Sequence, residues 1–129
     1  MPKIFIIEDE AVILAGLSAK FADQGFSVLN DDGQGDIKET WVRLNSEMPD
    51  YVVLDLVLPG FSGYDLLAKL KNDPVMAAKP VFVFTDISAA DSRVRCEALG
   101  VDYYFVKPDF NIDDFVKKVE KIINNLEKV

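Results

Sequence analysis

The stretch Tyr51-Val-Val-Leu-Asp-Leu-Val-Leu-Pro-Gly-Phe-Ser-Gly63 is the most informative part of the chain. Its first four residues are apolar and Pro59 and Gly60 soon end the run, which is typical of a central strand buried on both faces. The only charge in the stretch, Asp55, follows these four residues directly. Because ligands gather at the carboxyl ends of strands in an open parallel sheet, a reactive carboxylate is expected at this position. The alternative is that Asp55 only accepts backbone hydrogen bonds in the turn.

Three further apolar runs also end in polar side chains. Residues 4–7, 81–84 and 103–106 are short and rich in β-branched or aromatic types, as buried strands are. The polar residues that follow these runs are Glu8, Asp9 and Glu10, then Thr85, then Lys107. Because parallel strands have their carboxyl ends at the same edge of a sheet, we expect these side chains and Asp55 to converge there.

Helical patterns alternate with the strands, which predicts an α/β fold with a parallel sheet. A second strand is expected near residues 27–29. Ser62 and Ser88 stand where two of the helices begin, and both are suitable N-cap residues. The five expected helices cover residues 11–24, begin at Ile37, begin after Ser62, cover residues 89–99, and run from Asn111 to the end of the chain.

Size and charge restrict the class of protein. At 129 residues and 50% hydrophobic content, residues 1–129 are expected to form a single domain with its own core. There are 22 acidic and 14 basic residues and no His, so the net charge of −8 argues against direct nucleic-acid binding. A single Cys, no signal-like N-terminus and no apolar run of about 18 residues predict a cytoplasmic protein without disulfides or membrane spans.

The order of the polar residues at the strand ends resembles the receiver domain of two-component response regulators, the CheY-like family. An acid pair, a lone Asp55, a Thr85 and a Lys107-Pro occur in that order, with intervals of 30 residues from Asp55 to Thr85 and 22 from Thr85 to Lys107. The resemblance covers essentially the whole chain. It implies a doubly wound, flavodoxin-like (βα)5 fold with a parallel sheet of strand order 2-1-3-4-5.

The resemblance also implies a Mg²⁺ site. Asp9 and Asp55 would be direct ligands, the backbone carbonyl of Val57 a third, and Glu8 would act through water. This set suits Mg²⁺, which prefers oxygen ligands and retains several waters. Three carboxylates at one place also repel one another, and a divalent cation neutralises them at neutral pH.

In the same family pattern, Asp55 is the phosphoacceptor, and Lys107 and Thr85 bind phosphoryl oxygens. Thr85 and Tyr104 would form the switch. A cis peptide between Lys107 and Pro108 would aim the lysine, since only X-Pro bonds adopt cis at low cost. The simpler alternatives are a surface lysine at 107 and ordinary edge-strand packing of Tyr104.

As a receiver, the chain would not be an enzyme in the ordinary sense, because it would catalyse only its own phosphorylation and dephosphorylation. The implied phosphodonor is a phosphohistidine on a histidine kinase or phosphotransfer protein. The output would pass to a downstream protein target or a fused effector domain. Around Arg95, Asp102, Tyr103 and Lys118 lies the usual docking or dimer face of the family.

Three other functions compete with a phosphorylated receiver. A flavodoxin-type flavin module shares the fold, but the acidic loop Glu8-Asp-Glu10 would repel its phosphate. An aspartate-nucleophile phosphatase usually has a second acid two residues after the nucleophile, where this chain has Val57. The third is a degenerate receiver that binds partners without being phosphorylated.

Two apolar residues suggest a long-lived phosphorylated state. Val57 and Ile87 lie two positions after Asp55 and Thr85, where side chains flank the path of the attacking water. Neither can hydrogen-bond to a water and orient it. Asp86 adds a negative charge beside them, which is expected to disfavour anionic small-molecule phosphodonors.

Overall fold

The computed structural model describes residues 1–128. Strands and α-helices alternate along the chain, as the sequence predicts. The strands are β1 (Lys3–Ile7), β2 (Ser27–Asp31), β3 (Tyr51–Leu54), β4 (Val81–Thr85) and β5 (Tyr103–Val106). The helices are α1 (Ala11–Asp23), α2 (Ile37–Glu47), α3 (Gly63–Asn72), α4 (Ala90–Ala98) and α5 (Ile112–Glu127), with short 3-10 turns at Met76–Ala78 and Lys107–Asp109.

The five strands form one parallel sheet of order β2-β1-β3-β4-β5, which confirms the expected doubly wound fold. The register brings the ends of neighbouring strands level with each other. Ile7 pairs with Leu54, so Glu8 and Asp55 leave adjacent strands at the same height. Thr85 pairs with Val106, so Lys107 follows at the same edge.

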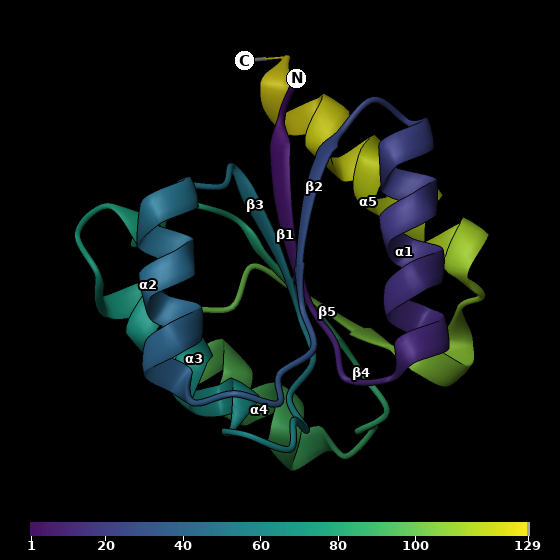
Figure 1. Ribbon diagram of the computed structural model, residues 1–129. Coiled ribbons are helices and arrows are strands. Elements are labelled where there is room, and N and C mark those ends of the chain that lie inside the picture. Colours follow the sequence, from purple (N-terminus) through teal and green to yellow (C-terminus); the bar gives the residue numbers. More distant parts are fainter. Residues whose placement is uncertain (129) are drawn as a thin grey trace.

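Helices cover both faces of the sheet (Figure 1). Helices α1 and α5 lie on one face, and α2, α3 and α4 lie on the other. Alternate strand residues therefore enter two separate cores, with Ile4 and Ile6 packed on the α1/α5 side and Phe5 and Ile7 on the opposite side. Burial on both faces explains why β1, β3 and β4 read as continuous apolar runs.

Several local expectations need correction. Strand β2 runs two residues past Leu29, because its ladder with β1 continues to Asp31. Ser62 occupies the N-cap position of α3, but its side chain makes no capping hydrogen bond. Ala89, and not Ser88, precedes α4. At α5 the expectation is met, since the Asn111 side chain accepts a hydrogen bond from the Asp114 amide.

Residues 1–128 contain no helix that combines the length and the apolar character needed to span a bilayer.

Candidate functional site

The carboxyl ends of β1, β3, β4 and β5 bring the expected side chains to one edge of the sheet. The polar or charged side chains buried there are Glu8, Asp55, Thr85 and Lys107, with exposed fractions of 2%, 4%, 0% and 7%. Buried charges are costly unless they are paired. Their burial therefore marks this edge as the candidate site.

Lys107 is the centre of this cluster. Its ammonium nitrogen lies 2.7 Å from Glu8 Oε1, 2.9 Å from Asp55 Oδ2 and 3.1 Å from Glu10 Oε2. An ammonium has three donor hydrogens, and here three carboxylates surround it. Burial acts to lower the pKa of Lys107, but its hydrogen bonds to Glu8 and Asp55 outweigh burial and the pKa is raised. The alternative of a surface lysine at position 107 is wrong, because Lys107 is buried and forms ion pairs with three carboxylates.

The carboxylates of Glu8, Asp9 and Asp55 form a group that could hold a metal ion. One oxygen of each lies within 4.8 Å of the others. Burial raises the pKa of Glu8 to about 7, a rise that the hydrogen bond from Lys107 opposes and the charge of Asp55 assists. One ammonium does not fully compensate this acidic group, and hard oxygen donors in this number suit a divalent cation such as Mg²⁺.

A small pocket opens beside these carboxylates. Its volume is about 140 Å³, and its lining residues are Asp9, Glu10, Asp55, Val57, Thr85 and Asp86. Val57 as a whole residue is 61% exposed. The Val57 amide lies 3.4 Å from Asp55 Oδ1. Val57 therefore lines the pocket beside Asp55, whereas Ile87 is absent from the lining.

Tyr104 does more than pack on an edge strand. Its hydroxyl donates to the Ile87 carbonyl at 2.7 Å and hydrogen-bonds to Ser92 Oγ at 2.8 Å. Ser92 in turn hydrogen-bonds to the Tyr64 hydroxyl at 2.5 Å. The loop after β4, helix α4 and helix α3 are thus connected through two tyrosines and one buried serine. Sequence reasoning missed Ser92 and Tyr64, since nothing in a helical pattern shows which hydroxyls meet.

The expected cis peptide before Pro108 is wrong, because residues 1–128 contain no cis bond. Lys107 and Pro108 instead begin a 3-10 turn, closed by a hydrogen bond of 3.1 Å from the Phe110 amide to the Lys107 carbonyl. The fixed φ of proline suits the first positions of such a turn. The long lysine side chain reaches the carboxylates with a trans peptide.

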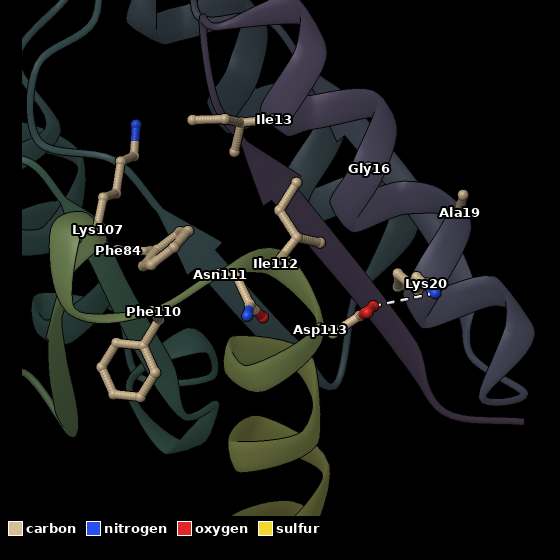
Figure 2. A pocket seen from close by; sticks show the side chains of 10 residues that line it. All are labelled: Ile13, Gly16, Ala19, Lys20, Phe84, Lys107, Phe110, Asn111, Ile112 and Asp113. Carbon is tan, nitrogen blue, oxygen red and sulfur yellow. Dashed lines mark ion pairs between the residues drawn. The ribbon is translucent and has the colours of Figure 1, made fainter.

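A second, more voluminous pocket lies elsewhere. It has a volume of about 560 Å³, lies between α1 and the start of α5, and is mainly apolar. Figure 2 shows Lys107 at its edge, with the ammonium directed away from Phe110 and Ile112. Only the aliphatic part of the lysine therefore belongs to this pocket, and its charge belongs to the acidic cluster.

Known proteins with similar sequences include transcriptional regulatory proteins. The phosphate regulon transcriptional regulatory protein PhoB of Rhizobium meliloti is 33% identical over 123 residues, which are 95% of this chain and 52% of that protein. The transcriptional regulatory protein PhoP of Escherichia coli O157:H7 is 28% identical over 121 residues, 94% of this chain and 52% of that protein. The chain thus spans about half the length of these relatives.

Solved structures agree with the fold. A receiver domain protein (CheY-like) from Methanospirillum hungatei has a TM-score of 0.85 at 22% identity, covering 99% of this chain and 98% of the other. The BeF3-activated receiver domain DrrB has a TM-score of 0.79 at 28% identity, with coverage of 96% and 98%. Residues 4–120 match the family described as "Response regulator receiver domain". Together with the sheet order and the acidic edge, this match shows that the chain belongs to the response regulator receiver domain family.

Proposed function

We propose that this receiver domain accepts a phosphoryl group on Asp55 in a Mg²⁺-dependent reaction. The observation that carries the proposal is the surroundings of this carboxylate. Asp55 is 4% exposed at the exit of the central strand, 2.9 Å from the Lys107 ammonium and next to the carboxylates of Glu8 and Asp9. A buried carboxylate that opens onto a pocket and lies beside a cation has the surroundings of a nucleophile for phosphoryl transfer.

The acidic group fits the metal that the family implies. Asp9 and Asp55 would hold Mg²⁺ directly, with the Val57 carbonyl as a third ligand and Glu8 acting through water. When bound, Mg²⁺ neutralises charge on the phosphoryl oxygens. The protein's own residues supply the rest of the site.

Asp55 supplies the electron pair in the proposed transfer. A carboxylate oxygen of Asp55 forms the new bond to phosphorus, and the bond from phosphorus to the donor's imidazole nitrogen breaks. The imidazole departs with the electrons of that bond and takes a proton from water. Lys107 donates to one phosphoryl oxygen and Thr85 offers its hydroxyl to another, so two hydrogen-bond donors of the protein stabilise the charge on the phosphoryl oxygens.

The proposed partners follow from this chemistry. The phosphodonor is a phosphohistidine on a histidine kinase or phosphotransfer protein, since this chain has no His of its own. Thr85 and Tyr104 form the proposed switch. The hydrogen bonds of Tyr104 to Ile87 and Ser92 connect this switch to the loop after β4 and to α4. The output passes to a separate protein or a fused effector; relatives named as transcriptional regulatory proteins are about twice as long as this chain.

The direct test is phosphorylation with a small-molecule donor. Incubation with acetyl phosphate and Mg²⁺ should add a single phosphoryl group, detected as one adduct by intact-mass analysis. The same incubation with a chelator in place of Mg²⁺ should give none. If neither condition produces an adduct, and a phosphohistidine donor also fails, the domain is a degenerate receiver that acts only by binding.

Asp9→Asn is expected to weaken Mg²⁺ binding at least about tenfold, because a charged oxygen ligand is lost from the metal site. Calorimetric titration with MgCl₂ measures the affinity. Asp23→Asn is the matched control, since Asp23 is exposed at the far end of α1 and should leave the affinity unchanged. Equal affinities in the two variants would place the cation elsewhere.

Val57→Asn is expected to shorten the lifetime of the phosphorylated state, on the order of tenfold, because an amide at the pocket mouth can orient the attacking water. Decay is followed by intact mass after removal of the donor, with Mg²⁺ present. Ile87→Glu tests the second flanking position separately and should have a smaller effect, since Ile87 does not line the pocket. If Val57→Asn and the combined variant decay no faster than the native domain, apolar shielding does not set the lifetime.

A further inference from the structure

The three carboxylates around Lys107 are not equivalent. Glu8 and Asp55 are almost fully buried, with side-chain exposures of 2% and 5%, and they approach the ammonium to 2.7 and 2.9 Å. Glu10 is 49% exposed and lies farther away, at 3.1 Å. If a phosphoryl oxygen is to receive a hydrogen bond from Lys107, one of these three partners must give up its own.

Glu10 is the partner that can leave at the lowest cost. A half-exposed carboxylate regains water when it moves, whereas a buried one would lose its compensation in a low-dielectric surrounding. Glu10 occupies the N-cap position of α1, but its side chain makes no capping hydrogen bond there and instead accepts one from Lys107. Its departure would therefore leave the start of the helix intact.

We propose that Glu10 is a positioning residue. It accepts one hydrogen bond from the Lys107 ammonium, and it gives up this hydrogen bond when a phosphoryl oxygen enters the site. This inference rests on the proposed function of Asp55. While Glu10 is in place, the ammonium is held between Glu8, Asp55 and Glu10, beside the carboxylate that would be phosphorylated. The same contact competes with the phosphoryl group, so Glu10 sets how readily the site accepts an anion that is not delivered by a protein.

Asp86 separates competition for the lysine from simple charge repulsion. It lines the same pocket as Glu10 and is exposed, but it makes no ion pair with Lys107. Glu10→Gln and Asp86→Asn each remove one negative charge from the pocket mouth. Only Glu10→Gln also weakens a contact to the ammonium.

The probe is beryllofluoride with Mg²⁺, which mimics a phosphoryl group on a carboxylate, and binding is followed by NMR titration. We expect Glu10→Gln to bind it about fivefold more tightly than the native domain, the upper range for a partly exposed ion pair. Asp86→Asn should gain no more than about twofold, and raising the salt concentration should remove that smaller gain. In the metal-free domain, the Lys107 ammonium protons should exchange with water faster in Glu10→Gln than in Asp86→Asn.

Equal gains in the two variants, or no gain in Glu10→Gln, would overturn the role of Glu10. Unchanged exchange of the Lys107 ammonium protons in Glu10→Gln would overturn it as well. Failure of the proposed function is visible separately in the same experiment, because the native domain would then bind no probe, or Asp55→Asn would bind it as well as the native domain does.

Discussion

Asp55→Asn is expected to abolish phosphoryl uptake completely, because an amide oxygen is not a nucleophile and the other carboxylates hold different positions. Asn keeps the size of the side chain, so the surrounding packing should persist. Acetyl phosphate and Mg²⁺ should leave the mass of the variant unchanged under conditions in which the native domain gains one phosphoryl group. Asp23→Asn, which alters an exposed Asp at the far end of α1, should be phosphorylated like the native domain.

The loss of phosphoryl uptake in Asp55→Asn should come from the missing nucleophile and not from a failure of the variant to fold. Removing one negative charge from a group of three carboxylates should relieve repulsion, so the free energy of unfolding should not fall. Chemical denaturation of the two proteins checks this. An adduct that persists in a folded Asp55→Asn variant would show that another side chain accepts the group.

Lys107→Met is expected to destabilise the domain more than any other change considered for this site. The substitution keeps much of the apolar stem but removes the ammonium that contacts Glu8 and Asp55, leaving two buried carboxylates without it. Removing one partner of a buried ion pair typically costs about 3 kcal/mol or more. We therefore expect the free energy of unfolding of the metal-free variant to be lower than that of the native domain by this amount at about pH 8. Lys117→Met, on the exposed face of α5, is the matched control and should change it little.

The deficit of Lys107→Met should depend on pH. The pKa of Glu8 is raised to about 7 by burial even though the hydrogen bond from Lys107 opposes the rise, so loss of the lysine should raise it further. An acid whose pKa is higher in the folded state favours folding when protonated, and that contribution disappears as the pH rises above its unfolded value. The deficit should therefore be small near pH 5, where Glu8 is mostly protonated in both folded proteins, and should grow as the pH rises above about 7, where Glu8 ionises in the native domain; it should be large at about pH 8, and Mg²⁺ should reduce it. Equal deficits at both pH values would mean that Lys107 stabilises the fold by packing alone.

The fold could be predicted because burial on two faces leaves a plain record in the sequence. Continuous apolar runs such as Tyr51–Leu54 are typical of strands covered by helices on both sides, and each run ends where the chain reaches the ligand edge of the sheet. Once the strands are parallel, their ends must meet, so Asp55, Thr85 and Lys107 must converge. The chemistry of the site follows from the sheet more than from any single motif.

The features that could not be predicted depend on the directions of individual side chains and on the local conformation of the backbone. Ser92 connects Tyr64 to Tyr104, yet all three belong to different elements whose relative rotation no pattern gives. Glu10 is visible in the acidic loop, but its contact to a lysine 97 residues away depends on where a half-exposed side chain turns. Leu126 follows Ile122 at the helical spacing of four residues, yet it is 42% exposed, because the helix extends beyond the edge of its core.

Phosphorylation of Asp55 can be tested by locating the phosphoryl group itself. Borohydride reduces an acyl phosphate to an alcohol, so treatment after phosphorylation should convert a modified aspartate to homoserine, which peptide mass analysis can place in the sequence. We expect homoserine at position 55 in the native domain treated with acetyl phosphate and Mg²⁺, and nowhere else. Homoserine in place of Asp9 or Asp86, with position 55 unchanged, would contradict the proposed function.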